Sequence, residues 1–363
     1  MRIARLAEEN PRTQGPERRA WYRRNSSAHL RAIAALVEDA LAARTTGEHG
    51  GQGGPSRAVA LGAGACTEAP LERLARAFEQ TLLVDVDVPG MARARDELPA
   101  SLRSRVDLLQ ADITGGVSDA LAGDLRGQPW RDLARLGPSA PLDAAAACLE
   151  RCPVPDPPQL AALIPHGYSL VFSDLVLTQL YSLPLLDVVD TLSLYAPDAV
   201  DRRETHARYR QAAQAFRRRI ALAHLALLAS LLAPEGAAIL ASDRTGYLLP
   251  PKSGHHAHDP RETLTVLPPD VLAIPDDLAP RFQLVGQPRA WEWLVTAPDA
   301  DHFGRMYEAV GVVPMVGCVT VSTCAAREPS WLESANSCGA SISRRSPIGG
   351  CSSNLCRISW LAA

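Results

Sequence analysis

The sequence predicts an α/β fold built on a doubly wound, mostly parallel sheet. Short apolar runs that suit buried strands alternate with segments of helical periodicity from residue 57 onward. The first apolar run ends in a glycine turn, Gly62-Ala63-Gly64, and the next two runs end in acidic residues, Asp85 and Asp112. In a doubly wound sheet the carboxyl ends of the strands line the ligand crevice. These three positions therefore predict a ligand site at one edge of the sheet.

The size and composition of the chain limit the kinds of protein it can be. Its 363 residues, 47% of them hydrophobic, suffice for one large α/β domain with insertions or for two domains. A net charge of −3 provides no general attraction for nucleic acid or for an anionic membrane. No apolar signal core begins the chain, no apolar stretch is long enough to span a bilayer, and the cysteine spacing fits no zinc site. We therefore expect a cytoplasmic protein without a metal site, and its arginine- and alanine-rich composition indicates a bacterial origin.

Three parts of the chain differ in character. Residues 1–52 are expected to form a basic arm, an amphipathic helix from Trp21 to Arg44 and a glycine-rich linker. Residues 53–320 are expected to form the α/β domain, and residues 321–363, rich in serine and cysteine, a disordered tail. The helix is indicated by two serines that could cap it and by apolar residues at helical spacing: Ser26, Ser27, Leu30, Ile33, Leu36, Val37 and Leu41.

Within the α/β domain the apolar pattern predicts the order of the elements. Strands are expected at 57–61, 81–86, 106–110, 169–173 and 237–242, and helices at 68–79, 89–97 and 202–233. Segments 282–297 and 305–315 are expected to pair as closing antiparallel strands. Segments 115–167, with a helix near 142–150, and 181–201 are longer than ordinary loops and are interpreted as insertions.

The glycine turn by itself leaves the identity of the cofactor open. A nicotinamide dinucleotide turn has glycine at a third position, where this chain has Thr67, so that interpretation is weakened but stays an alternative. Asp85 and Asp87 follow the turn by about twenty residues, and a carboxylate there could accept both hydroxyl hydrogens of a ribose.

Five motifs, taken in order, resemble those of the class I S-adenosylmethionine-dependent methyltransferases. They are VALGAGAC, LLVDVD, QADI, LVFSDLVLTQL and LLAPEGAAILASD, and the resemblance spans residues 57–316. It implies a Rossmann-like methyltransferase fold with a seven-stranded sheet whose seventh strand is antiparallel. The chain departs from the family turn at Ala65-Cys66, where Thr-Gly or a similar pair is common.

The resemblance also implies roles for individual residues around S-adenosylmethionine. The turn Gly62-Ala63-Gly64 would pack against the amino-acid part, and Asp85, with Asp87 as second choice, would bind the ribose. The remaining implied cofactor residues are Asp112 and Ile113 beside the adenine, and Ser173 and Asp174 beside the sulfonium and the acceptor.

The acceptor pocket is expected to come from the two insertions and the N-terminal helix, because long loops in such folds usually bind ligands. Tyr22, Gln179 and Tyr181, together with Thr178, are the candidate substrate residues. No general base is assigned, although Asp174, His206 and His166 carry suitable groups.

These observations favour a methyltransferase that acts on an unidentified small molecule, with S-adenosylmethionine as cofactor. Two alternatives remain at this stage. The first is an NAD(P)-dependent oxidoreductase on a Rossmann fold, and the second is a module that binds S-adenosylmethionine without catalysis. The histidine-rich stretch HHAHD at 255–259 lies in a segment rich in proline and glycine, and we do not expect it to form a metal site.

Overall fold

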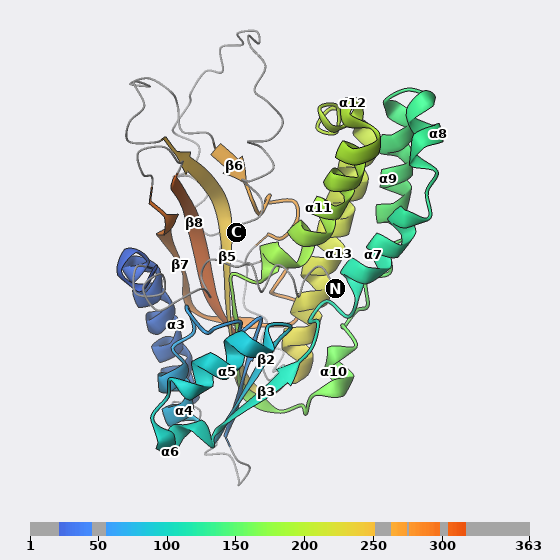
Figure 1. Ribbon diagram of the computed structural model, residues 1–363. Coiled ribbons are helices and arrows are strands. Elements are labelled where there is room, and N and C mark those ends of the chain that lie inside the picture. Colours follow the sequence, from blue (N-terminus) through green and yellow to red (C-terminus); the bar gives the residue numbers. More distant parts are fainter. Residues whose placement is uncertain (1–21, 46–55, 251–262, 274–275, 298–303, 317–363) are drawn as a thin grey trace, which may run out of the picture. The chain divides into compact units, whose positions relative to one another are not determined.

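A single mixed sheet organises the protein (Figure 1). The computed structural model describes residues 22–45, 56–250, 263–273, 276–297 and 304–316, all of which belong to the first of two units, Met1–Gly317 and Cys318–Ala363. The strand order is β3-β2-β1-β4-β5-β8-β7, and the short β6 pairs with β5. The bounds are β1 Arg57–Leu61, β2 Gln80–Asp85, β3 Val106–Gln110, β4 Tyr168–Asp174, β5 Leu232–Leu249, β6 Thr263–Thr265, β7 Gln283–Thr296 and β8 Gly304–Met315.

The strands from β3 to β5 are parallel, and β8 runs antiparallel to both β5 and β7. Alternate residues of the central strands enter two different cores. Val59 and Leu61 of β1 pack in one core, whereas Ala58 and Ala60 pack in the other. Strands covered on both faces need apolar side chains on both, which is why β1 and β4 appear in the sequence as nearly continuous apolar runs.

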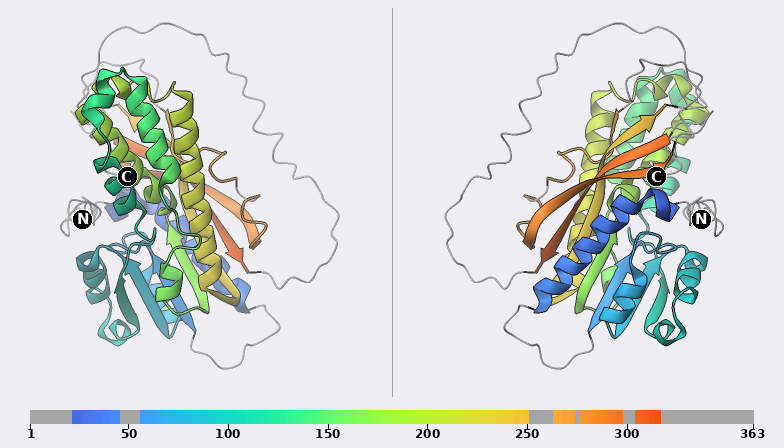
Figure 2. Two further views of the ribbon diagram at one scale, coloured as in Figure 1. Left: turned by 90° about the vertical axis from the view of Figure 1, so that its right-hand side faces the viewer. Right: turned by 90° about the vertical axis from the view of Figure 1, so that its left-hand side faces the viewer.

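Two layers of helices cover the sheet (Figure 2). One layer holds α3 Ser27–Thr45, α4 Leu71–Ala77, α5 Val88–Asp96 and α6 Ala100–Arg103. The other holds α7 Val117–Arg126, α8 Trp130–Arg135, α9 Ser139–Arg151, α10 Leu160–Leu163, α11 Leu177–Tyr195, α12 Pro197–Val200 and α13 Ala207–Leu231. Among the helices in these described ranges, none is both long enough and apolar enough to cross a bilayer.

The predicted strands are confirmed, and the main error concerns segment 181–201. This segment is not an extended insertion loop but the continuation of α11, followed by α12. The helix carries Pro184 in its interior, and because proline usually ends or kinks a helix, the sequence did not indicate a continuous helix here. Strand β5 is also longer than expected, because its last residues extend past the sheet edge and pair with β6 and β8.

The N-terminal helix has a turn near its start. Residues 22–25 are helical, and α3 starts at Ser27 after a turn at Ser26. The Ser26 hydroxyl donates to the Leu294 carbonyl of β7 at 3.2 Å, so its side chain attaches the helix to the sheet. Trp21, the linker up to residue 52, the stretch 255–259 and the tail 321–363 lie outside the described residues.

Candidate functional site

The glycine turn lies at the carboxyl end of β1. Gly62 and Gly64 have positive φ angles of 65° and 48°, which glycine adopts without steric cost. A Cβ atom on Gly62 would overlap Cγ2 of Val176, so a side chain there would displace Val176. A Cβ atom on Gly64 would meet only the Asp85 carboxylate, at 4.0 Å. The turn therefore packs tightly against the chain after β4 and leaves an open position toward the end of β2.

Cys66 explains how the turn forms without a third glycine. It adopts a positive φ of 50°, and its backbone N–H donates to the Ala63 carbonyl at 2.7 Å. This left-handed conformation costs a non-glycine residue about 1–2 kcal/mol. The side chain is buried, and burial raises the pKa of the thiol far above its usual range. The thiol is therefore protonated at neutral pH and has a structural role.

Asp85 and Asp87 differ in what their carboxylates do. Asp85 accepts from the backbone N–H of Gly64 and from that of Asp87, each at 2.8 Å, and so faces the glycine turn. Burial raises the pKa of Asp85, and the backbone hydrogen bonds partly oppose that shift. Asp87 instead caps α5 by accepting from the Gly90 N–H at 2.9 Å. Of the two carboxylates, only that of Asp85 is hydrogen-bonded to the glycine turn in these contacts.

Asp112 shapes the loop that connects β3 to α7. Its carboxylate accepts from Thr114, through both the backbone N–H and the hydroxyl, and from the N–H of Gly116. Ile113 is 7% exposed and packs in the core with Val117. This loop lies beside the end of β2, because Gln110 is the register partner of Asp85.

Ser173 and Asp174, adjacent in β4, face opposite sides of the sheet. The Ser173 hydroxyl is fully buried and lies 2.8 Å from Nε2 of His224 on α13. Burial lowers the pKa of His224 to about 4, so its imidazole is neutral at neutral pH. The Ser173 side chain thus points toward α13. Only the Ser173 backbone could lie beside the sulfonium, as the resemblance implies.

Asp174 contacts a histidine that the sequence interpretation did not include among the site residues. Its Oδ2 lies 3.4 Å from Nε2 of His29, and both side chains are almost completely buried. Nδ1 of His29 accepts from the indole N–H of Trp291 at 2.9 Å. A neutral imidazole carries one proton, so that proton is on Nε2, toward Asp174. The sequence did contain an indication of this burial, because His29 lies four residues before Ile33 and so on the same apolar face of the helix.

Tyr22 takes part in a second chain of hydrogen bonds rather than facing an acceptor pocket. Its hydroxyl donates to Glu68 Oε1 at 2.7 Å and accepts from the indole N–H of Trp293 at 3.0 Å. Trp291 and Trp293 are two residues apart on β7 and so lie on one face of the strand. Tyr22 and His29 thus link this face of β7 to two carboxylates: that of Glu68, after β1, and that of Asp174, at the end of β4.

Tyr22→Phe is expected to lower the free energy of unfolding by about 1–2 kcal/mol, because it removes a buried hydroxyl that donates to Glu68 and accepts from Trp293. Urea denaturation measures this difference. Cofactor affinity should stay close to that of the wild type, since Tyr22 does not contact the glycine turn or Asp85 through these bonds. A large loss of cofactor affinity at unchanged stability would instead indicate that Tyr22 contacts the ligand.

Two of the candidate substrate positions on α11 are structural. Thr178 donates to the Asp243 carboxylate at 2.5 Å. Tyr181, 1% exposed, donates to the Val266 carbonyl at 2.9 Å, and burial raises its pKa. Gln179 is half-buried and keeps its candidate role. The inward-facing polar groups near the start of α11 therefore connect it to β5 and to the segment after β6.

His206 and His166 do not join the other candidate residues. His206 caps α13 by accepting from the Tyr209 N–H, and it lies eighteen positions before His224, a distance of about 27 Å along the helix axis. His166 precedes β4 at the amino edge of the sheet, where its Nδ1 donates to the Ser230 carbonyl at 2.7 Å. Both lie away from the carboxyl edge that Asp85 and Asp174 occupy.

The strand order, with β8 antiparallel between β5 and β7, defines the Rossmann-like methyltransferase fold. This is the fold that the resemblance implied, including its antiparallel seventh strand. The site positions lie where ligands bind in such sheets, at the carboxyl ends of β1, β2, β3 and β4. The chain thus has the fold of the class I S-adenosylmethionine-dependent methyltransferases.

We also compared the chain with known proteins. No family model and no curated protein matches the chain. Among solved structures, a glycopeptide N-methyltransferase complexed with S-adenosyl-L-methionine is 11% identical, with 77% of this chain and 94% of that chain covered and a TM-score of 0.30. An S-adenosylmethionine-dependent methyltransferase from Aquifex aeolicus is 11% identical (79% and 98% covered, TM-score 0.28). Magnesium protoporphyrin IX methyltransferase from Synechocystis PCC 6803 is 14% identical (79% and 85% covered, TM-score 0.32). The fold assignment rests on the strand order.

Proposed function

We propose that this protein is an S-adenosylmethionine-dependent methyltransferase that acts on a small-molecule acceptor. One observation carries the proposal. In a sheet of methyltransferase strand order, the Asp85 carboxylate accepts directly from the Gly64 N–H at the ends of β1 and β2, and the position beside the Gly64 Cα is open. A carboxylate there can accept the two hydroxyl hydrogens of a ribose, and the absence of a Cβ on Gly64 lets a ligand approach the backbone closely.

The residues present fit this cofactor. S-adenosylmethionine carries no phosphate, so the turn needs only to accommodate a zwitterion and a thioether, and the substitution of Cys66 for a third glycine is compatible with that. When bound, the cofactor supplies an activated methyl group. Asp85, held by the N–H groups of Gly64 and Asp87, would orient the ribose. Val176, packed on Gly62, would exclude water from the methionine end.

A calorimetric titration with S-adenosylhomocysteine tests this proposal. The full-length protein is expected to bind S-adenosylhomocysteine and not NAD⁺ or NADP⁺ under the same conditions. Heat with a nicotinamide dinucleotide and none with S-adenosylhomocysteine would replace the proposal with the oxidoreductase alternative.

A second candidate is a module that binds the cofactor without catalysis. It is favoured by the enclosure of the side chains at the end of β4, since Ser173 and His224 are at most 1% exposed and the Asp174 side chain is 2% exposed. Methyl transfer needs few diagnostic side chains, so a direct assay must separate the two. Incubating the protein with a cell extract and methyl-labelled donor should produce a labelled small molecule. Cofactor binding without any labelled product would favour the binding module.

The affinity for S-adenosylhomocysteine is expected to fall on acidification. Ribose hydroxyls need an ionised carboxylate, and burial raises the pKa of Asp85, so its charge is lost at a higher pH than that of an exposed aspartate. Calorimetry over the pH range in which circular dichroism reports a folded protein measures the effect. Asp85→Asn, which cannot ionise, should lack this fall, and an unchanged profile in that variant would assign the pH dependence to another group.

A further inference from the structure

The chain after β4 makes a turn in a strained backbone conformation. This β4 turn, residues 174–176, begins directly beside the glycine turn, because Ser173 of β4 and Leu61 of β1 are register partners. Leu175, its middle residue, has a positive φ of 56°, a left-handed conformation that costs a non-glycine residue free energy. Such conformations persist only where surrounding contacts hold them, and they cluster at functional sites.

The second and third residues of the β4 turn are held by the sheet and by the glycine turn. The Leu175 N–H donates to the Ala241 carbonyl of β5 at 2.9 Å, and the Leu175 side chain packs in a core cluster with aromatic residues of β7 and β8. Val176 packs so closely on Gly62 that a Cβ atom there would overlap it. A change in the conformation of the β4 turn would therefore move Val176 relative to the glycine turn.

The first residue of the β4 turn, Asp174, is held by the N-terminal helix. His29, in the first turn of α3, is completely buried, and its Nε2 lies 3.4 Å from Oδ2 of Asp174. The imidazole stacks on the ring of Trp293, with centroids 5.0 Å apart, and its Nδ1 accepts from the indole N–H of Trp291. Because an indole nitrogen only donates, the proton of the neutral imidazole is fixed on Nε2, toward the carboxylate.

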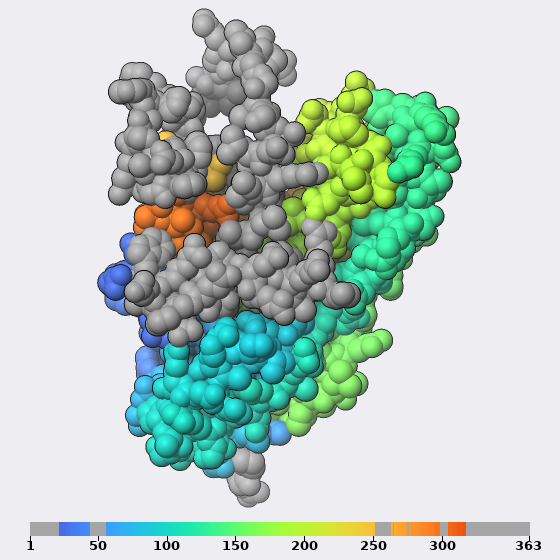
Figure 3. All heavy atoms as spheres, viewed as in Figure 1, coloured from blue at the N-terminus to red at the C-terminus, as the bar shows by residue number. Residues whose placement is uncertain are grey.

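The helix that carries His29 is itself fixed to the sheet. In the space-filling view α3 (blue) adjoins β7 and β8 (orange) (Figure 3). Ile33, Leu36 and Val37, one and two turns after His29, are at most 1% exposed and pack in the core on this side of the sheet. The imidazole therefore has a defined position beside Asp174 without any bound ligand.

We propose that His29 is a positioning residue of the cofactor site, which acts through Asp174 to hold the β4 turn against the glycine turn. The inference rests on the proposed function, since it takes S-adenosylmethionine as the ligand of this site. His29 does not contact the cofactor in this role. Its Nε2–H orients the Asp174 carboxylate, and the β4 turn then keeps Val176 on Gly62, where the methionine end of the cofactor would lie.

His29→Gln and His29→Asn test which ring nitrogen carries the effect. The glutamine amide N–H₂ can take the position of Nε2 and donate to Asp174, whereas the shorter asparagine amide reaches only the position of Nδ1, toward Trp291. Calorimetry of the full-length protein with S-adenosylhomocysteine should find binding about five- to tenfold weaker in His29→Asn and close to the wild-type value in His29→Gln. Equal affinities of the two variants, or weaker binding by His29→Gln, would overturn the inference.

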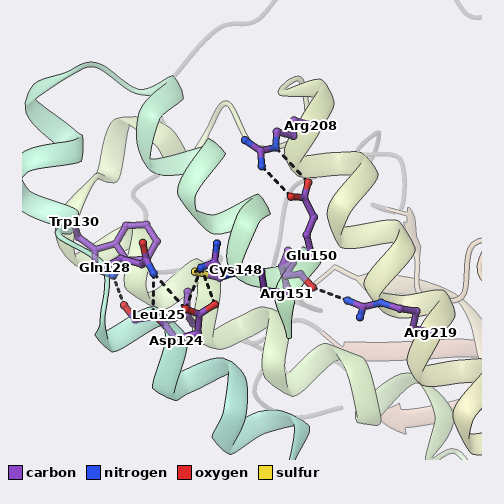
Figure 4. Close-up of polar contacts among 10 residues, drawn as sticks. Asp124, Leu125, Gln128, Trp130, Cys148, Glu150, Arg151, Arg208 and Arg219 are labelled. Carbon is purple, nitrogen blue, oxygen red and sulfur yellow. Dashed lines mark hydrogen bonds and ion pairs between the residues drawn. The ribbon is translucent and has the colours of Figure 1, made fainter. Parts of the chain in front are cut away.

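Controls separate positioning from a general loss of stability, which urea denaturation measures in parallel. Tyr22→Phe removes another hydrogen bond to the same face of β7 and is expected to lower stability without lowering cofactor affinity. Glu150→Gln lies in the opposite helical layer, where Glu150 of α9 pairs with Arg208 of α13 at 2.9 Å (Figure 4), and it should leave the affinity unchanged. If affinity instead falls in proportion to stability in all of these variants, His29 has only a structural role and the inference is wrong.

An Asp174→Ala background tests the route of the effect. If His29 acts through Asp174, His29→Asn should cause no further loss of affinity in this background. Additive losses would show that His29 acts by another route and would overturn the inference. Failure of the wild-type protein to bind S-adenosylhomocysteine would overturn the proposed function and this inference together, whereas wild-type binding that is insensitive to His29 would overturn the inference alone.

Discussion

Asp85→Asn is expected to weaken the binding of S-adenosylhomocysteine by about 1–3 kcal/mol, or about 5- to 150-fold. The carboxylate accepts from two backbone N–H groups, those of Gly64 and Asp87. Asparagine has only one acceptor oxygen, so its amide N–H₂ group would face one of these donors. The variant therefore loses a charge-assisted bond to the ribose and also loosens the glycine turn.

Asp87→Asn provides the matched control for this prediction. Asp87 caps α5 through the Gly90 N–H, and asparagine caps helices about as well as aspartate. Its backbone N–H, which donates to Asp85, is unchanged by the substitution. Calorimetry should therefore find a much smaller effect than for Asp85→Asn, with thermal unfolding monitored in parallel. A larger loss of affinity in Asp87→Asn than in Asp85→Asn would indicate that Asp87, and not Asp85, binds the ribose.

Between pH 6.5 and pH 4 the protein is expected to lose about 3 kcal/mol of stability through His224 alone. Burial lowers the folded-state pKa of His224 to about 4, whereas an unfolded histidine has a pKa of about 6.5. The unfolded state binds more protons over this interval, so the stabilisation is fully present above about pH 6.5 and is lost as the pH falls toward 4. Urea denaturation at several pH values measures the loss.

His224→Gln and Ser173→Ala separate this effect from the other groups that titrate in the same range. Glutamine does not ionise, so the stability difference between wild type and His224→Gln should shrink as the pH falls. Ser173→Ala removes the hydrogen-bond partner but keeps His224 buried, and since burial causes the shift, this variant should keep the wild-type pH dependence. If His224→Gln also keeps it, the loss belongs to another group.

The central strands β1 and β4 and the middle of β5 could be predicted because they are buried on both faces. β1 and β3 begin and end at the predicted residues, and the glycine turn and Asp85 follow directly from where β1 and β2 end. The helices of the insertions were harder to predict, because α11 carries Pro184 in its interior and proline usually ends or kinks a helix. Its packing against α7, α9 and α13 overrides the weak local signal.

The contacts of the candidate site depend on residues far apart in the chain. His29 meets Trp291 across 262 positions, and Ser173 meets His224 across 51. A lone histidine in an apolar helix, such as His224, indicates a buried imidazole that needs a partner, but does not identify that partner. The packing of α11 against α7 and α8, which brings the two insertions together, likewise has no signature in either segment.

The sequence by itself determined the order of the elements, the turn at Gly62 and Gly64, and the acidic end of β2. These features are local, since each depends on a few neighbouring residues and on the two-residue or 3.6-residue period of the backbone. Only the tertiary structure decided that Asp85 rather than Asp87 faces the turn, and that Tyr22 and Asp174 are buried in hydrogen-bonded or charged contacts. The physical reason is that the direction of a side chain and its burial are set by what packs against it, and those partners come from distant strands and helices.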